Sequence, residues 1–260
     1  MQIMGLRTPV IKPNDDLPEI IAKAAKKIGG LKDGDVLIIA SSAVSTAQGN
    51  LRKLMEVKVS ERARKLSKES GLDEQFVEVI IEEADRVLSV GEKCLLTLKD
   101  GMIRINAGVD RTNAPLGHVV LSPRNVERTA NDILRALQQR TGKKIGVIIA
   151  DSHVQPLRLG TVGQAIATGG IKPVIDCRRK RDIYGRPLRM TFRAIADQLA
   201  SAAQVVMGEA AERIPAVIVR GADVKFSKTR ISPKIEPKRC IYANLLGLKK
   251  KKSRRRSVLK

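Results

Sequence analysis

Three short runs of apolar residues limit most strongly what this chain can fold into: VLIIA at 36–40, GVIIA at 146–150 and AVIV at 216–219. A strand with one wet face alternates apolar and polar residues, whereas these runs have no polar residue at all. They therefore predict strands that are buried on both faces. Segments with helical spacing lie between them, so the class is mixed α and β.

The helical segments are expected at 17–28, at 60–87 with a break at Ser70-Gly71, at 126–139 before Thr141-Gly142, and at about 191–207. Asp16 stands three residues before Glu19, the spacing of a capping box. KCLLTLKDGMIRIN, residues 93–106, predicts two strands joined by an Asp-Gly turn. Beyond Gly221 the composition loosens into a trailing segment.

The formal net charge of +22 favours anionic partners such as nucleotides, phosphorylated metabolites or nucleic acid. The tail at 249–260 holds eight basic residues and no acid, so the rest of the chain still carries 22 − 8 = +14. Such a tail is typical of a disordered, self-repelling arm, with RNA tethering as the alternative. Aromatic residues are only 2% of the chain, which disfavours stacking on single-stranded nucleic acid.

Cysteine and histidine are too sparse to build a metal site. Cys94, Cys177 and Cys240 are far apart and form no CxxC pair, and His118 and His153 are the only histidines. A bound metal should therefore have oxygen ligands, which favours magnesium, manganese or calcium. No apolar run approaches the roughly 18 residues of a membrane span, and no signal peptide is evident, so we expect a cytoplasmic protein.

Two polar segments carry candidate chemistry. INAGVDRTNAP, residues 105–115, brings Asp110 and Asn113 to one turn, although turn formation alone explains such residues equally well. Asp151 and Ser152 follow an apolar strand directly, at the edge where sheets buried on both faces present ligands. They are a natural oxygen pair for a hard metal that holds phosphates, with a strand-end turn or helix cap as the alternative.

Three further segments give weaker signals. Glu209 follows an alanine-rich helix and is either a third oxygen ligand or a solvated acid. LGTVGQAIATGG, residues 159–170, has glycines that could admit an anion, but its spacing matches no known phosphate loop. CRRKRDIYGRPLR, residues 177–189, is either a solvated face or a receptor for a polyanionic substrate.

The order of motifs from about Thr8 to Gly221 resembles the coenzyme F-420-0:L-glutamate ligase family, the gamma-glutamyl ligases of deazaflavin cofactor biosynthesis. The matching pieces are TPVIKPNDDL, LKDGDVLIIASSAVSTAQG, INAGVDRTN, GVIIADSH, PLRLGTVGQAIA, RDIYGRPLRMT, IADQLASAAQVVMGEA and IPAVIVRG. The NAGVD segment with its following Thr-Asn and the Tyr-Gly-Arg segment are the most specific of them.

The resemblance implies an α+β fold with mixed sheets and two lobes over residues 1–248, a basic disordered tail at 249–260, and a homodimer. It also implies a GTP-dependent and metal-dependent ligase that acts on small molecules. The carboxylate of the deazaflavin precursor would take a phosphoryl group from GTP, and the amine of L-glutamate would then displace phosphate from the acyl phosphate.

The resemblance, applied position by position, implies two bound divalent ions, Mg²⁺ or Mn²⁺, with K⁺ as a further candidate. Asp110 and Asp151 would hold the first ion, and Ser152 and Glu209 the second. No catalytic base is assigned. The expected nucleotide contacts are Thr8, Pro9, Val10, Ile11, Ser41, Ser42, Asn113, Met207, Gly208 and Ala210.

The chain departs from the family near this site. Thr46 replaces a lysine of an SKAEG-like motif, and Val154-Gln155 replaces a Gly-Arg pair. The smaller departures are Gln48, Asn50, Ser152, Ala167 and Gln198. Either arginines elsewhere compensate, or the enzyme uses a different acid or amine. A third alternative is an inactive homologue that binds nucleic acid through its tail.

Overall fold

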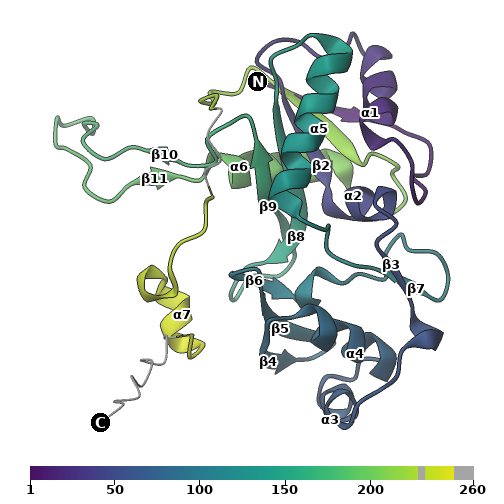
Figure 1. The fold of residues 1–260 in the computed structure, drawn as a ribbon. Helices are drawn as coiled ribbons and strands as arrows, with labels where there is room; N and C mark the ends of the chain where they lie inside the picture. The colour runs from purple at the N-terminus through teal and green to yellow at the C-terminus, as the bar shows by residue number, and fades with distance from the viewer. Residues whose placement is uncertain (228–231, 249–260) are drawn as a thin grey trace, which may run out of the picture.

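A five-stranded sheet forms the centre of the protein in the computed structural model, which describes residues 1–227 and 232–248 (Figure 1). The strand order is β1-β12-β2-β8-β9. β2 and β8 run parallel, and the other neighbours are antiparallel, which confirms an α+β fold with mixed sheets. The strands are β1 (Gln2–Leu6), β2 (Val36–Ala40), β8 (Gly146–Val154), β9 (Thr161–Gly169) and β12 (Ala216–Arg220).

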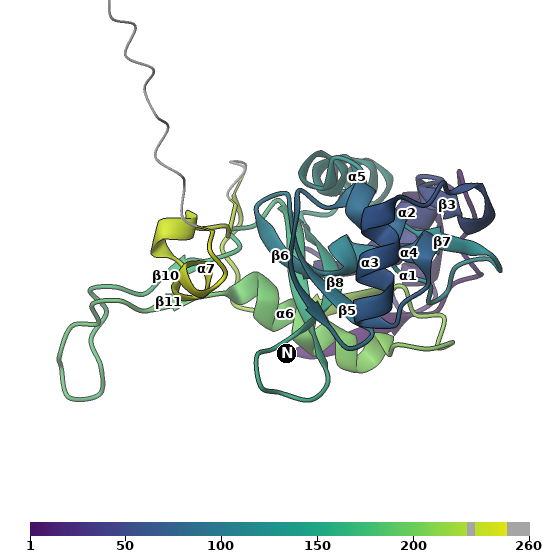
Figure 2. The same ribbon diagram turned by 90° about the horizontal axis from the view of Figure 1, so that it is seen from below.

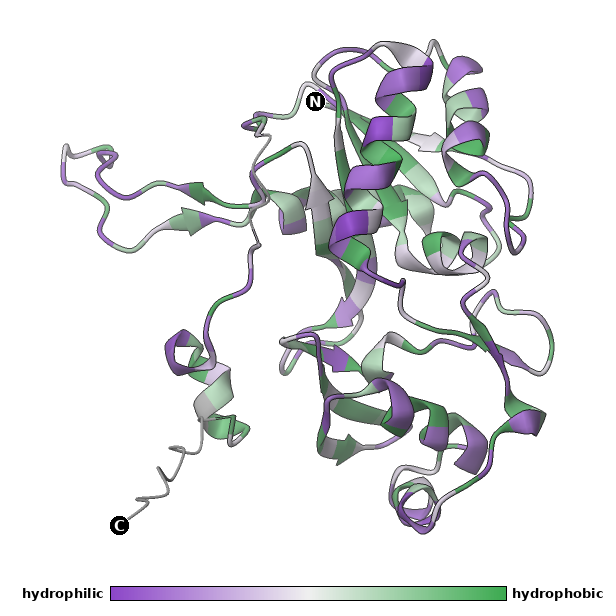
Figure 3. Ribbon diagram, in the orientation of Figure 1, coloured by the Kyte–Doolittle hydropathy of each residue, from purple (hydrophilic) through white to green (hydrophobic). Residues whose placement is uncertain are grey.

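The apolar runs are buried on both faces because alternate side chains enter two separate cores. Leu37 and Ile39 pack in the core under α1 (Leu17–Lys26) and α5 (Val126–Thr141). Val36 and Ile38 pack in the opposite core, against α6 (Ile195–Met207). Figure 3 shows apolar residues concentrated on these strands and polar residues on the outer faces of α1 and α5. The buried-strand prediction is confirmed.

A smaller lobe lies beside the large sheet (Figure 1). Phe76, Ile80 and Leu95 form its core. Its elements are α3 (Glu61–Ser70), α4 (Glu74–Glu83), β4 (Arg86–Gly91), β5 (Cys94–Lys99), β6 (Met102–Ile105) and the 3-10 helices η1 (Leu54–Glu56) and η2 (Asn106–Gly108). The short strands β3 (Leu51–Lys53) and β7 (His118–Val120) pair where the chain enters and leaves it.

Local signals placed several element ends correctly. Asp16 caps α1 by accepting a hydrogen bond from the Glu19 amide, 2.9 Å away. Gly71 and Gly142 end α3 and α5 in the left-handed conformation that glycine adopts most easily. The Asp-Gly turn joins β5 and β6 as expected.

Two helix boundaries were wrong. The helix expected to reach residue 87 ends at Glu83, and 86–91 forms β4 because it pairs with β5 and completes a three-stranded sheet. The helix expected from about Thr191 begins at Ile195, because β11 (Phe192–Arg193) pairs with β10 (Ile175–Asp176). In both cases pairing with another strand decided the structure, and the local sequence did not reveal it.

The arginine-rich segment lies on an arm between β10 and β11 that projects from the body in both ribbon views (Figures 1 and 2). Arg178 pairs with Asp176, and Arg186 pairs with Asp182, all on this arm. α2 (Ser41–Ala47), η3 (Pro237–Arg239) and α7 (Ile241–Leu245) complete the elements, and the basic tail lies outside the described residues. Within those residues, no helix is both long and apolar enough to cross a membrane.

α6 packs closely against β9 at Gly163. A Cβ at this position would overlap the carbonyl oxygen of Ala200 and lie 2.6 Å from its carbonyl carbon. Backbone atoms cannot move aside as a flexible side chain can, so Gly163→Ala should destabilise the fold by about 1–3 kcal/mol. Urea unfolding would measure this. Gly185→Ala on the arm has open space and only an unfavourable φ, so it should cost about 1 kcal/mol or less. Equal effects at the two positions would contradict the steric explanation.

Candidate active site

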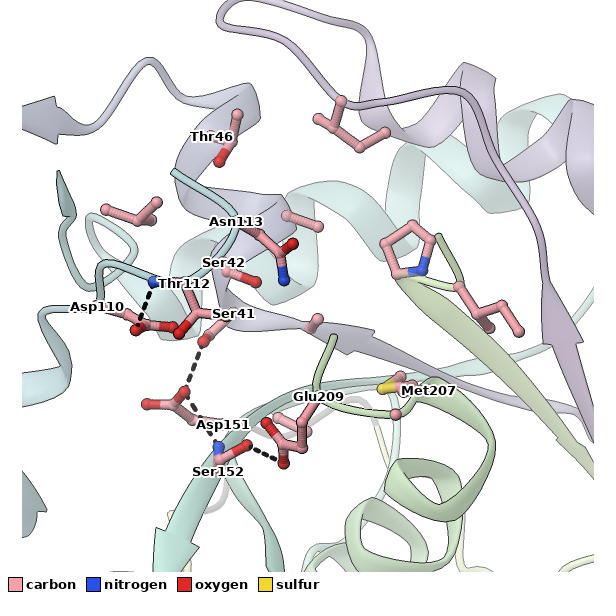
Figure 4. Close-up of a pocket in the computed structure, with 18 of the residues that line it drawn as sticks. Ser41, Ser42, Thr46, Asp110, Thr112, Asn113, Asp151, Ser152, Met207 and Glu209 are labelled. Atoms are coloured by element: carbon pink, nitrogen blue, oxygen red, sulfur yellow. Dashed lines mark hydrogen bonds between the residues drawn. The ribbon is translucent and has the colours of Figure 1, made fainter. Parts of the chain in front are cut away.

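A cavity of about 300 Å³ opens where β2 ends beside the later part of β8. Every residue to which the family resemblance assigns a role lines this cavity, although the residues come from five separate segments (Figure 4). These residues are Thr8, Pro9, Val10, Ile11, Ser41, Ser42, Asp110, Asn113, Asp151, Ser152, Met207, Gly208, Glu209 and Ala210. Their proximity is a structural result, and their individual roles remain predictions.

The parallel pairing of β2 and β8 brings Ser41 and Asp151 together. Ala40 lies opposite Ala150 in the register, so the next residues, Ser41 and Asp151, are neighbours. β2 ends at Ala40, but the expectation that the other strand stops at Asp151 was wrong, because β8 continues to Val154 by pairing with β9. The Ser41 hydroxyl donates to Asp151 Oδ1 at 2.8 Å. Figure 4 shows the carboxylates of Asp110 and Asp151 on either side of this hydroxyl.

The second oxygen of Asp151 accepts from Arg104, a residue that the sequence interpretation missed. Arg104 Nη2 lies 2.5 Å from Asp151 Oδ2, and Nη1 donates to Ser122 Oγ at 2.8 Å. Arg104 is buried in β6, within the segment MIRI. A single arginine between two isoleucines of a short strand was the available signal, because buried arginines nearly always have a partner.

Glu209 is held at the end of α6 by three side chains. Ser152 Oγ donates to Glu209 Oε1 at 2.8 Å, and Thr161 Oγ1 donates to the same oxygen at 3.1 Å. Gln204 Nε2 donates to it as well. The carboxylate therefore has a fixed position beside Ser152, although it is exposed to the cavity.

The loop of Asp110 and Asn113 is both a well-formed turn and a wall of the cavity. The amide of Thr112 donates to Asp110 Oδ1 at 2.9 Å, which is a turn within the loop. Asn113 adopts a left-handed conformation, and its Nδ2 donates to the carbonyl of Ala210 at 3.2 Å. This contact joins the loop to the segment that carries Glu209.

The acids do not form a closed metal cage. Over residues 1–227 and 232–248, no group of three or more His, Cys, Asp or Glu side chains is arranged to hold a metal ion. The cavity instead offers separate oxygen donors on Asp110, Asp151, Ser152 and Glu209. Such a donor set suits Mg²⁺, which is commonly bound by one or two carboxylates together with substrate phosphates and water.

Arg213 is the only lysine or arginine among the described residues that line the cavity. Its Nη2 donates to the carbonyl of Thr8 at 3.3 Å, and the Thr8 amide donates to the Arg213 carbonyl at 3.1 Å. Thr46, which replaces a family lysine, also lines the cavity, whereas Val154 and Gln155 do not. The positive charge near the cavity therefore comes from positions other than the expected ones.

Gln48 and Asn50, two further departures from the family, lie outside the cavity lining. Both bind Arg124: its amide donates to Gln48 Oε1 at 2.8 Å, and its Nε donates to Asn50 Oδ1 at 2.9 Å. These residues thus join the turn after α2 to the loop before α5.

His153 follows Asp151 and Ser152 on β8 but does not line the cavity. Burial lowers the pKa of its imidazole below the ordinary value, an effect that the nearby carboxylate of Asp151 partly opposes. Burial also raises the pKa of Asp197, which accepts from the Ala165 amide on β9. The lowered pKa favours the neutral imidazole, and His153 lies outside the cavity wall.

Comparison with known families matches residues 5–221 to the family described as F420-0:Gamma-glutamyl ligase. A protein of Methanopyrus kandleri named Coenzyme F420:L-glutamate ligase is 44% identical over 212 residues, which is 81% of this chain and 82% of that protein. A protein of the same name from Methanocaldococcus jannaschii is 39% identical over 92% of this chain and 94% of its own. This chain therefore belongs to the F420-0:gamma-glutamyl ligase family.

Proposed function

We propose that this protein joins L-glutamate to the deazaflavin precursor coenzyme F-420-0 through an amide bond, using GTP and a divalent metal. Family membership supports the ligase reaction with glutamate. The observation that carries the proposal for the site is the convergence of residues 8–11, 41–42, 110–113, 151–152 and 207–210 on one cavity. These segments lie far apart in the sequence, yet the fold brings their hydroxyls, amides and carboxylates to the same cavity, as a nucleotide and metal site would require.

The proposed reaction has two steps. An oxygen of the precursor's carboxylate takes the terminal phosphoryl group of GTP, and GDP leaves. The glutamate amine then attacks the acyl carbon, the C–N bond forms, and phosphate leaves as the amine loses a proton. Most of the catalysis in such transfers comes from placement and from stabilising charge on the phosphoryl oxygens.

The cavity residues would divide these tasks. Asp110 and Asp151 would hold one divalent ion, and Ser152 and Glu209 a second, with K⁺ as a further candidate ion. The bound metal would offset negative charge on the phosphates. Asn113 and residues 8–11 would position the nucleotide, and Arg213 would contact a phosphate oxygen from the opposite wall.

Replacing Arg213 with methionine should raise the KM for GTP by roughly 10–100-fold, because a hydrogen bond to a charged group contributes about 1.5–3 kcal/mol. The KM for glutamate should change little. Steady-state kinetics with GTP as the varied substrate would measure this. Arg128→Met on the exposed face of α5 is the matched control and should leave both constants unchanged. A normal KM for GTP in Arg213→Met would remove Arg213 from the nucleotide site.

We also propose that the enzyme is a homodimer. The arm exposes Ile183, Tyr184 and Met190, and α7 exposes Ile241 and Leu245. Apolar side chains on such projecting elements are typical of surfaces that another subunit covers. Light scattering of the full chain would show a mass of twice 28.4 kDa if this is right. A monomer at micromolar concentration would contradict it.

Turnover tests the reaction itself. The purified protein with GTP, Mg²⁺ or Mn²⁺, L-glutamate and the precursor should release GDP and glutamylated product in equal amounts. A second mass increment would show addition of a further, gamma-linked glutamate. GDP release that needs a different acid or amine would favour a ligase of the same family with another substrate. No GDP release with any acceptor, together with salt-sensitive RNA binding that requires residues 249–260, would favour the nucleic-acid-binding alternative.

A further inference from the structure

Arg104 is a buried residue in direct contact with Asp151. It does not line the cavity itself, yet it contacts one of the two carboxylate oxygens that Asp151 could offer there. We propose that Arg104 is a positioning residue that fixes the Asp151 carboxylate and presents it to a divalent cation. The inference rests on the proposed function, because that function gives Asp151 its role.

The guanidinium of Arg104 is itself held firmly. Its Nη1 donates to Ser122 Oγ at 2.8 Å, and the Ser122 hydroxyl donates to the carbonyl of Ala107 at 2.8 Å. Gly108 packs against it so closely that a Cβ there would lie 2.9 Å from Nη1. The side chain is 9% exposed. Arg104 therefore has little freedom to leave Asp151.

The backbone of Arg104 is fixed by a second, buried set of contacts. Thr97 Oγ1 donates to the Arg104 carbonyl at 2.7 Å and accepts from the Ala107 amide at 2.9 Å. The segment from Arg104 to Ala107 is thus attached to β5 by a side chain as well as by strand pairing. Both the side chain and the backbone of Arg104 are therefore held in place by buried hydrogen bonds.

Asp151 has a single orientation as a result. Oδ2 is bound by Arg104, while Oδ1 accepts from Ser41 Oγ at 2.8 Å and from the Ser152 amide at 3.1 Å. The side chain of Asp151 is 26% exposed, so the charge of Arg104 also offsets the cost of its partial burial. Mutation of a group that hydrogen-bonds to a metal-binding carboxylate commonly lowers metal affinity or activity by roughly 10–100-fold.

Arg104 also connects the two lobes at the site. It belongs to β6 of the smaller lobe, whereas Asp151 belongs to β8 of the large sheet. Through Ser122 it also reaches the chain segment after β7. The position of Asp151 in the cavity therefore depends on how the smaller lobe packs against the large sheet.

Mn²⁺ binding to the free protein tests the proposal without requiring turnover. Electron paramagnetic resonance of the unbound ion would measure this binding. Arg104→Met should weaken Mn²⁺ binding roughly 10–100-fold and lower kcat by a similar factor, with the KM for glutamate within about threefold. Arg104→Lys should recover part of both losses, because it keeps the charge but cannot reach Asp151 and Ser122 together.

Ser122→Ala provides an independent test, because it removes the support of Arg104 without touching Asp151. It should weaken Mn²⁺ binding by at least about threefold. The double variant Ser122→Ala/Arg104→Met should be no worse than Arg104→Met alone, because Ser122 acts through Arg104. Additive losses would overturn the proposal. If Arg104→Met does not fold, Ser122→Ala and Arg104→Lys still decide it.

Lys99→Met is the matched structural control. Lys99 pairs with Glu83 in the same lobe, with side chains 17% and 25% exposed, and neither residue lines the cavity. It should lower thermal stability without changing Mn²⁺ affinity or kcat. The proposal fails if Arg104→Met behaves like this control, or if the wild-type protein binds no Mn²⁺. A different outcome is that the Arg104 and Ser122 variants weaken Mn²⁺ binding as expected, but the wild-type protein makes no glutamylated product. This would refute the proposed substrate and leave the positioning role of Arg104 supported.

Discussion

Asp151→Asn is expected to lower kcat by about 10²–10³-fold, the loss typical when one group that stabilises phosphoryl charge is removed. Asparagine keeps the size of the side chain and one oxygen, which can still accept from Arg104, but its NH2 group replaces the oxygen that accepts from Ser41 and from the Ser152 amide. It also loses the negative charge that a divalent cation requires. Mn²⁺ binding should fall in parallel. Arg104 would keep a neutral partner, so stability should fall by only about 1–3 kcal/mol. GDP release, Mn²⁺ titration and urea unfolding would measure the three quantities.

Asp132→Asn on α5 makes the same chemical change far from the cavity. Asp132 also forms ion pairs with two arginines, Arg128 and Arg135, but these pairs lie at the exposed surface. Its variant should keep both turnover and Mn²⁺ affinity. If Asp151→Asn also kept both, Asp151 would not be a metal ligand, and the assignment of Asp110 beside it would lose its support.

The sequence predicts the central strands well, because burial on both faces affects every residue of VLIIA and GVIIA. Strand pairing is less visible. β4 pairs with a strand that immediately follows it, yet its residues also suit the end of a helix. β10 and β11 are separated by the whole arm, and nothing near Phe192 reveals its partner. Two-residue strands exist only because of that partner, so local patterns cannot predict them.

The site shows the same division between local and distant information. The resemblance identified the residues of the cavity wall, because each belongs to a short motif. Arg104 and Arg213 belong to none of the motif positions to which a role was assigned. Arg104 matters through a contact 47 residues away, and Arg213 through a contact with Thr8, 205 residues away. Side chains of this kind become visible only when the fold brings the segments together.

These arginines also bear on the departures from the family. Thr46 leaves the cavity without the expected lysine, and Val154-Gln155 lies outside its wall. Arg104 pairs with Asp151, and Arg213 lines the cavity. The sequence left two explanations open, compensation by arginines elsewhere or a different substrate. The choice between substrates still depends on turnover with the precursor.

Gly208→Ala is expected to lower kcat/KM by roughly 10–100-fold, because it would displace Glu209 and the backbone that we propose contacts the nucleotide. Gly208 has φ +69° and ψ −173°, a conformation that costs residues other than glycine about 1–3 kcal/mol. A Cβ would also overlap the carboxylate of Glu212, which accepts from the Ala210 amide at 2.8 Å. Steady-state kinetics and thermal unfolding would separate loss of activity from loss of fold.

Glu212→Gln separates the two causes of that loss. It keeps an oxygen that can accept from the Ala210 amide, and it leaves the backbone of Gly208 unchanged, so kcat/KM should stay within about threefold. A large loss in Glu212→Gln would show that the charge of Glu212, rather than the glycine conformation, maintains the loop. Full activity in a folded Gly208→Ala would contradict both explanations. It would mean that the turn after α6 can move without moving Glu209, and hence that Glu209 is not held for metal binding by this turn.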